Sequence, residues 1–191
     1  MPQSELILAS ASPRRKGLLA AAGVEFEVIE SGVDEIRAAH ESARDFALRV
    51  ACDKALSVSG RFPARLVIAA DTVVECDGKI LEKPTDAADA RRMLRLLSGN
   101  SHVVVTAFAL ARAGVVVERA VATSRVTFRT LAPEEIEAYI ETGEPFDKAG
   151  SYGIQDAGGS FIVAVDGSRD TVMGLPVDQV LRALRRQQKG D

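Results

Sequence analysis

The stretch "ILASASPRRKGLLAAAG", residues 7–23, joins the pattern of a buried β-strand to the start of a helix within a few residues. Its apolar beginning predicts a strand, and Ser12 is a suitable helix N-cap. Pro13 suits the first helical position because the N–H group that proline lacks has no partner there, and Gly23 ends the helix. A strand that passes directly into a helix is typical of α/β proteins, so this stretch predicts that fold class.

Three consecutive cations, Arg14, Arg15 and Lys16, stand at this helix start. Positive charges there oppose the helix dipole, so they cost stability unless an anion offsets them. The backbone N–H groups of a first turn are unpaired in a helix, and the hydroxyls of Ser10 and Ser12 lie beside them. The guanidinium of Arg14 could grip two phosphate oxygens at once. The pattern favours a phosphate site, but a solvated charge run explains the cations equally well at this point.

The rest of the chain alternates β-rich and helical segments. Helical periodicity marks residues 42–60, 86–98, 133–143 and 176–188, and β-rich runs mark 65–84, 102–130 and 161–168. Residues 25–35 show the alternation of a strand that leads into a loop. Asp77-Gly78 is a strong hairpin signal, and a second turn is expected near Ala113 and Gly114. These segments predict a mixed β-sheet flanked by helices. The glycine-punctuated segment 144–161 is expected to be a functional loop.

Length and composition limit the class of protein. The chain has 191 residues, 47% of them hydrophobic, which suits one large domain or two packed lobes. A net charge of −3 and a pI near 5.5 argue against a protein that coats polymeric nucleic acid, because such proteins present a broad basic face. No secretory signal and no run long enough to cross a membrane are visible, so we expect a cytoplasmic protein without a membrane partner.

The cysteines and histidines suggest no catalytic arrangement. Cys52 and Cys76 are too few for a disulfide framework and show no zinc-site spacing, so both are expected to be buried thiols. His40 and His102 belong to no motif and are expected to have structural or surface roles. A Ser-His-Asp hydrolase with a covalent serine intermediate is therefore disfavoured.

Five further residues could carry chemistry. Asp71 follows the apolar run "LVIAA" and is expected to interrupt the strand and emerge at its end, where α/β proteins place ligand groups. It could equally cap a turn together with Thr72. Lys54, Lys83 and Glu35 are unremarkable singly, since such residues are mostly on the surface. If the fold gathers the lysines and the helix start around Asp71, the arrangement suits a polyphosphate with a divalent metal ion.

The motifs "LASASPRRKGLL", "AADTVV", "LEKP", "KAGSYGIQ" and "VMGLP" resemble, in this order, those of the Maf family of nucleoside triphosphate pyrophosphatases. The resemblance runs from residue 6 to about residue 185 and implies a single Maf-like domain over residues 1–191. It also implies a fold similar to that of inosine triphosphate pyrophosphatases. That fold is an elongated mixed sheet with flanking helices and two lobes around a deep cleft.

The resemblance implies an enzyme that requires Mg²⁺, or another divalent cation such as Mn²⁺, and hydrolyses a nucleoside triphosphate to the monophosphate and pyrophosphate. The motif "DKAGSYGIQ" looks like that of the subgroup acting on dTTP and UTP, and modified pyrimidine nucleotides are conceivable substrates. A homodimer is often found in the family. The alternative is a nucleotide-binding regulator of cell division and septum formation with little turnover.

The resemblance also assigns roles to individual residues. Asp71, Lys54, Lys83 and Arg14 would be catalytic, with Glu35 and Asp71 as metal ligands or Asp71 as the base that takes a proton from the attacking water. Ser10 and Gln155 would bind the substrate. Ser12, Arg15 and Thr72, which lie in the same motifs as Ser10 and Asp71, are expected to bind it as well. Tyr152 could stack on the base or pack inside the loop.

Two positions depart from the family pattern. Asp156 follows "GIQ" where similar proteins usually carry glycine, and Arg169 stands where an aromatic residue is common. Because both departures adjoin motifs, base preference is less firmly implied than phosphate chemistry.

Overall fold

The computed structural model describes residues 5–189. Its strands are β1 (Leu6–Leu8), β2 (Glu27–Val28), β3 (Leu66–Cys76), β4 (Lys79–Leu81), β5 (Ser101–Arg112), β6 (Val115–Phe128) and β7 (Ile162–Asp166). Its α-helices are α1 (Pro13–Ala21), α2 (Ala43–Ser59), α3 (Ala87–Leu97), α4 (Pro133–Glu141), α5 (Arg169–Met173) and α6 (Val177–Lys189). Three short 3₁₀ helices lie between α4 and β7: η1 (Glu144–Asp147), η2 (Ala149–Ser151) and η3 (Ala157–Phe161).

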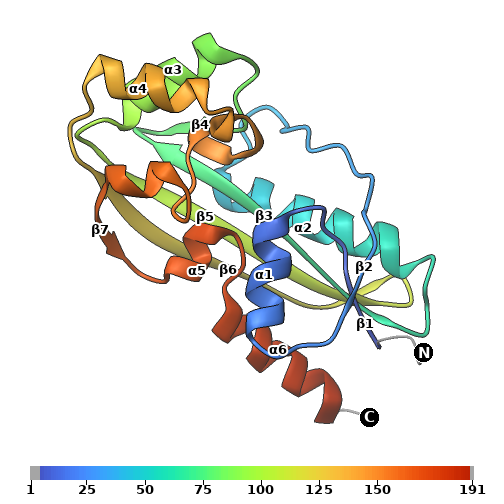
Figure 1. Cartoon of the computed structure of the whole chain (residues 1–191). Helices are drawn as coiled ribbons and strands as arrows, with labels where there is room; N and C mark the ends of the chain where they lie inside the picture. The colour runs from blue at the N-terminus through green and yellow to red at the C-terminus, as the bar shows by residue number, and fades with distance from the viewer. Residues whose placement is uncertain (1–4, 190–191) are drawn as a thin grey trace. The chain divides into compact units, whose positions relative to one another are not determined.

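The strands form one mixed sheet in the order β2-β1-β3-β5-β6-β7, with β4 paired to β3 (Figure 1). Strand β1 runs parallel to β2 and β3, whereas β4 is antiparallel to β3 and β7 is antiparallel to β6. The predicted α/β class with a mixed sheet and flanking helices is confirmed.

The chain divides into two compact units. The first extends to Asp71 and also contains Thr106–Ala122 and the chain from Gly174 onward. The second contains Thr72–Val105 and Thr123–Met173. Each unit therefore combines segments that are distant in the sequence.

In the first unit, both faces of the sheet are buried. Leu8 and Ile68 pack with Leu19 of α1 in one apolar cluster. Val67 and Ala69 point to the other face because successive strand residues alternate, and they are also fully buried. Helices α1 and α6 cover the first face and α2 covers the second (Figure 1). Strands buried on both faces explain why the sequence shows continuous apolar runs there rather than alternation.

In the second unit, α3 and α4 lie side by side over an apolar core that contains several aromatic rings (Figure 1). Tyr152 packs its ring 4.7 Å from that of Phe128, centroid to centroid, and its hydroxyl lies 2.7 Å from Nε2 of His102. His102 is 1% exposed. The prediction of a structural role for His102 is confirmed, and of the two possibilities for Tyr152 the structure shows packing.

Burial of His102 predicts a loss of stability in acid. Desolvation lowers its pKa from 6.5 to about 4. The unfolded chain therefore binds a proton that the folded chain does not, so stability is complete above pH 6.5 and falls as pH drops toward 4. We expect this residue to contribute a slope of about 1.4 kcal/mol per pH unit inside that window.

Urea denaturation of His102→Gln and the parent at several pH values measures this slope. The exposed His40, whose φ of 64° suits asparagine, supplies the control variant His40→Asn, which should keep the parental slope. An unchanged slope in His102→Gln would contradict the assignment.

Several local predictions are confirmed in detail. Ser12 caps α1, Asp86 caps α3, and the Asp77-Gly78 turn joins β3 to β4. Ala113 and Gly114, both at positive φ, form the turn between β5 and β6. Short-range signals thus located these boundaries correctly.

Other local predictions are wrong or incomplete. Residues 25–35 form a strand followed by a loop as expected, but the strand, β2, has only two residues. Helix α5 was not expected, and segment 144–161 contains η1–η3 rather than only loop. Asp71 does not interrupt its strand, because β3 runs without a break from Leu66 to Cys76. An acid can stay inside a strand when a cation on the facing element balances its charge.

Cys52 and Cys76 are buried and not joined by a disulfide, as predicted. Within residues 5–189, the structure has no helix of the length and apolarity that a bilayer crossing requires. The helix expected over 176–188 is α6, which ends at Lys189, and residues 190–191 lie outside the described part.

Candidate functional site

Asp71 and Lys54 form a buried ion pair in the first unit. Asp71 has the same alternation as Val67 and Ala69, so its side chain points to the face that α2 covers. Lys54 extends from α2, and its Nζ lies 2.8 Å from Asp71 Oδ1. Lys54 is 6% exposed and Asp71 is 4% exposed. A strand and a helix that are adjacent in the fold thus bring together two charges that are seventeen residues apart in the sequence.

Glu35 forms an ion pair with the same Lys54 ammonium group. Its Oε1 lies 2.6 Å from Lys54 Nζ, and 37% of its side chain is exposed. Glu35 belongs to the segment between β2 and α2, which has no regular secondary structure at this residue. Lys54 therefore joins one buried and one accessible carboxylate.

Burial dominates the electrostatics of Asp71. Desolvation raises the pKa of its carboxyl, while the positive charges of Lys54 and Arg15 act in the opposite direction and Glu35 adds to the increase. Desolvation likewise lowers the pKa of the Arg15 guanidinium, and Asp71 and Glu35 oppose that shift. Arg15 thus interacts electrostatically with both carboxylates, so the start of α1 and the Lys54–Asp71 ion pair belong to one charged cluster.

The start of α1 differs from the expected row of unpaired N–H groups. The Ser12 hydroxyl accepts a bond from the backbone N–H of Arg15 at 3.4 Å, and the Ser10 hydroxyl accepts one from the backbone N–H of Ser12 at 3.2 Å. Pro13 has no N–H group. The chain itself thus satisfies two of the backbone donors that were expected to be available to a phosphate.

Arg15 has a well-defined position. Its Nε donates to the carbonyl oxygen of Gly174 at 2.9 Å, and its Nη1 donates to Ser10 Oγ at 3.4 Å. Burial lowers the pKa of Arg15, and the positive charge of Arg14, the preceding residue of α1, adds to that shift. Lys16 is exposed. Arg14 was predicted to be catalytic and Arg15 to bind the substrate, and two hydrogen bonds orient Arg15.

The Gly174 carbonyl was not recognised from the sequence as part of the site. Gly174 lies within the motif "VMGLP", which was noticed only as part of the family pattern. A backbone acceptor has no residue-type signal of its own. Its contact with Arg15 nevertheless gives that motif a physical role in the first unit.

Three predicted residues belong to the second unit. Thr72 is the next residue of β3 after Asp71 and is half-buried, Lys83 is exposed beyond β4, and Gln155 is exposed between η2 and η3. The structure thus brings together Ser10, Ser12, Arg14, Arg15, Glu35, Lys54 and Asp71 in the first unit. The participation of Thr72, Lys83 and Gln155 in the site stays a prediction.

The carboxylates of Glu35 and Asp71 are the candidate metal ligands. No group of three or more His, Cys, Asp or Glu side chains in residues 5–189 has an arrangement that could hold a metal ion. The two carboxylates contact the same Lys54 ammonium, so that cation already lies between their oxygens. Mg²⁺ is often held by one or two carboxylates together with the substrate's phosphates, and Glu35, the more accessible of the two, is the carboxylate that fits such an ion.

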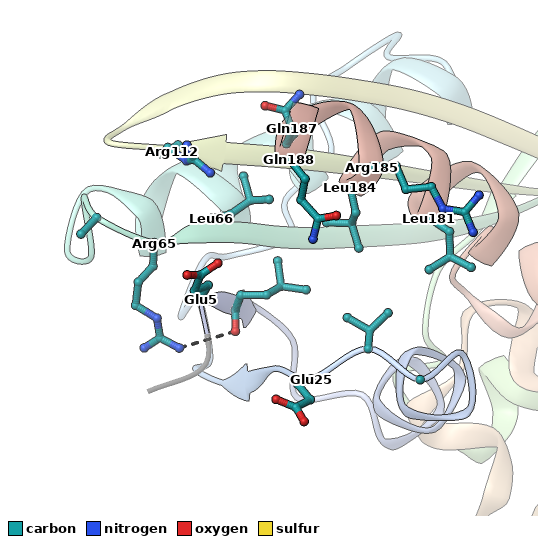
Figure 2. A pocket seen from close by; sticks show the side chains of 14 residues that line it. Glu5, Glu25, Arg65, Leu66, Arg112, Leu181, Leu184, Arg185, Gln187 and Gln188 are labelled. Atoms are coloured by element: carbon teal, nitrogen blue, oxygen red, sulfur yellow. Dashed lines mark hydrogen bonds between the residues drawn. The ribbon is translucent and has the colours of Figure 1, made fainter. Parts of the chain in front are cut away.

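A cavity of about 970 Å³ in the first unit has a different lining (Figure 2). Leu6, Val24, Leu66 and Leu184 contribute apolar surface, and Arg65 donates to the Leu6 carbonyl oxygen at 3.5 Å. None of the predicted site residues lines this cavity. We therefore assign it no part in the chemistry of the charged cluster.

Comparisons with known proteins agree with the motif pattern. A family model described as "Maf-like protein" matches residues 5–187. A dTTP/UTP pyrophosphatase from Geotalea uraniireducens (strain Rf4) is 50% identical over 187 residues, which cover 96% of this chain and 95% of the relative. One from Vibrio cholerae serotype O1 is 48% identical over 185 residues, covering 95% and 98%.

A solved structure of a HAM1 protein from Coxiella burnetii covers 95% of this chain and 98% of its own, with 14% identity and a TM-score of 0.49. A likeness at this level carries no inference about function.

Proposed function

Because the chain belongs to the Maf family, as its motifs indicated, we propose that it is a nucleoside triphosphate pyrophosphatase that hydrolyses dTTP and UTP to the monophosphate and pyrophosphate. The relatives that carry this activity in their names match nearly the full length of the chain. The observation that carries the proposal is the buried Lys54, which joins Asp71 and Glu35 within the electrostatic reach of Arg15.

The reaction needs a proton acceptor for the attacking water and positive charge around the phosphates. We assign the first task to Asp71, because a carboxyl whose pKa is raised by burial accepts a proton more readily than an ordinary one. Lys54 orients this carboxylate through its 2.8 Å hydrogen bond. Arg14 and Arg15 supply cations at the start of α1, where the helix dipole also favours an anion.

Ser10 and Ser12 shape the same helix start. Because the oxygen of Ser10 already accepts two hydrogen bonds, its own O–H is the group that can donate to a phosphate oxygen. Ser12 holds the first turn in place through its cap. Ser10 would thus contact the phosphates directly, whereas Ser12 would contribute by fixing the start of α1.

We propose that a divalent cation, Mg²⁺ or Mn²⁺, is held by Glu35; Asp71 is its second ligand in the alternative assignment in which Asp71 does not accept the proton of the attacking water. Such an ion would neutralise charge on the phosphates. Glu35 suits this role because its carboxylate is accessible as well as anchored to Lys54.

The residues of the second unit enter the proposal through the sequence motifs. We propose that Lys83 balances phosphate charge and that Thr72 and Gln155 bind the nucleoside part of the substrate. The Gln155 amide offers both a donor and an acceptor, and its exposure leaves it accessible to a base. We also propose that residues 1–191 act as one functional domain, because the family match runs through both units.

We predict that Arg15→Ala raises KM for dTTP by about 10- to 100-fold, because a charge-assisted hydrogen bond to phosphate is lost. Arg15→Lys should raise KM for dTTP nearly as much as Arg15→Ala, because a lysine cannot reproduce the planar guanidinium that bonds to both Gly174 and Ser10. Steady-state kinetics measures the effect. Lys16→Ala, which removes an exposed cation from the same turn, is the control and should leave KM near the parental value. Equal effects of the two alanine variants would contradict the placement of Arg15.

The activity itself is tested with a substrate panel. The purified chain is given dTTP, UTP, CTP and purine triphosphates with Mg²⁺, and pyrophosphate and orthophosphate are measured separately. We expect pyrophosphate from dTTP and UTP. Orthophosphate as the first product would indicate a general phosphohydrolase, and no product from any nucleotide would refute the proposal.

The alternative of a nucleotide-binding regulator with little turnover is not favoured, because the matched relatives are named for an enzymatic activity. Calorimetry beside the pyrophosphate assay separates the two, since the regulator predicts tight binding without product. We further propose action in the cytoplasm on free nucleotides. A homodimer is also proposed, and light scattering of the purified chain tests it.

A further inference from the structure

The segment around Gln155 in the second unit is held tightly, although Gln155 itself is exposed. Residues 150–154, which directly precede it, are all buried. Gly159 donates its backbone N–H to the carbonyl oxygen of Asp156 at 2.8 Å, and Ala157 donates its own to Oε2 of Glu144 at 3.2 Å. Gln155 thus projects from a backbone that is fixed on both sides.

Lys148 provides a buried cation inside this segment. It is 7% exposed, and its Nζ lies 2.5 Å from the Glu144 carbonyl oxygen, 2.7 Å from Asp147 Oδ1 and 3.1 Å from Asp156 Oδ2. A buried ammonium is costly unless it is paired and hydrogen-bonded. These three oxygens provide that compensation, and one of them belongs to the residue next to Gln155.

The packing around Gly153 makes the arrangement specific. A Cβ at Gly153 would lie 2.8 Å from Cε of Lys148 and would also collide with the carboxylate of Asp156. The backbone of Gly153, two residues before Gln155, therefore packs directly against the side chains of the Lys148–Asp156 pair. A Cβ at Gly159 would likewise lie only 2.5 Å from the carbonyl oxygen of Ile154.

We infer that the Lys148–Asp156 ion pair positions Gln155 and thereby sets how well the enzyme discriminates between pyrimidine bases. This inference rests on the proposed function. Thymine and uracil present a carbonyl acceptor where cytosine presents an amino donor, so a fixed amide can prefer one and reject the other. An amide that is free to rotate can donate to the carbonyl of thymine or uracil and can also accept from the amino group of cytosine. The selectivity between these bases then falls.

The test is Asp156→Ala, which removes the carboxylate but leaves Lys148 its contacts with Glu144 and Asp147. We expect the ratio of kcat/KM for dTTP to that for dCTP to fall by about 3- to 10-fold, as for one lost or weakened hydrogen bond. Asp156→Asn should show a smaller decrease, because its amide oxygen can still accept from Lys148. Glu137→Gln, which removes a carboxylate from the Arg91–Glu137 pair of the same unit, is the matched control and should leave the ratio unchanged.

A double-mutant cycle separates positioning from a general loss of structure. In a Gln155→Ala background, Asp156→Ala should have no further effect on the dTTP:dCTP ratio, because its influence acts through Gln155. An unchanged ratio in Asp156→Ala, an equal loss of activity toward both nucleotides, or an additive effect in the Gln155→Ala background would each overturn the inference. If the parent releases no pyrophosphate at all, the proposed function fails instead.

Discussion

Replacing Asp71 with asparagine is expected to lower kcat for dTTP by about 100-fold or more, the contribution typical of a general base. Asparagine has nearly the same shape but cannot accept the proton of the attacking water. Lys54 keeps its ion pair with Glu35 in this variant, so the buried ammonium remains compensated. The loss should therefore concern turnover rather than folding.

Pyrophosphate release under saturating dTTP gives kcat, and urea denaturation of the same preparation reports whether the fold is retained. Asp53→Asn is the control, because Asp53 neighbours Lys54 on α2 but its side chain is 43% exposed and paired with Arg49. We expect that variant to keep parental turnover. Full activity in Asp71→Asn would remove Asp71 from the mechanism, whatever its position.

The element pattern was predictable because its signals are local. Ser12, Asp86 and the Asp77-Gly78 pair act on their immediate neighbours, and each marks a boundary in the structure. The strand in 25–35 is short for the complementary reason. Its alternation of polar and apolar residues is suitable for a strand, but only Glu27 and Val28 pair with β1. Pairing also depends on the length and position of the neighbouring strand, which the residues of 25–35 do not determine.

The site was predictable in its residue types but not in its geometry. A position after a buried apolar run suggested Asp71, whereas Lys54 became a candidate only through the resemblance to the Maf family. The alternation of β3, combined with the placement of α2 on one face of the sheet, brings them together. The contact between Arg15 and the carbonyl oxygen of Gly174 was beyond sequence reasoning, since 159 residues separate the two and any residue supplies a backbone carbonyl.

Lys54→Met is expected to have the largest effect on stability. Methionine fills a similar volume, but it leaves the carboxylate of Asp71 buried without its nearest cation. Breaking a buried pair on one side costs about 3–5 kcal/mol, because the remaining charge is uncompensated. The free energy of unfolding from urea denaturation measures this loss, and we expect turnover to fall as well because Asp71 loses its orientation.

The double variant Lys54→Met/Asp71→Asn distinguishes this cause from a packing defect. Removing the uncompensated charge should restore most of the lost stability, since a buried pair can be replaced by neutral residues at little cost. Activity should stay absent, because the proton acceptor is also gone. If the double variant is as unstable as Lys54→Met alone, the loss comes from packing around α2. If Lys54→Met unfolds at the parental urea concentration, the buried ion pair does not stabilise the fold. In both cases the electrostatic account of Lys54 would be wrong, whereas recovery of stability without recovery of activity separates its structural contribution from its catalytic one.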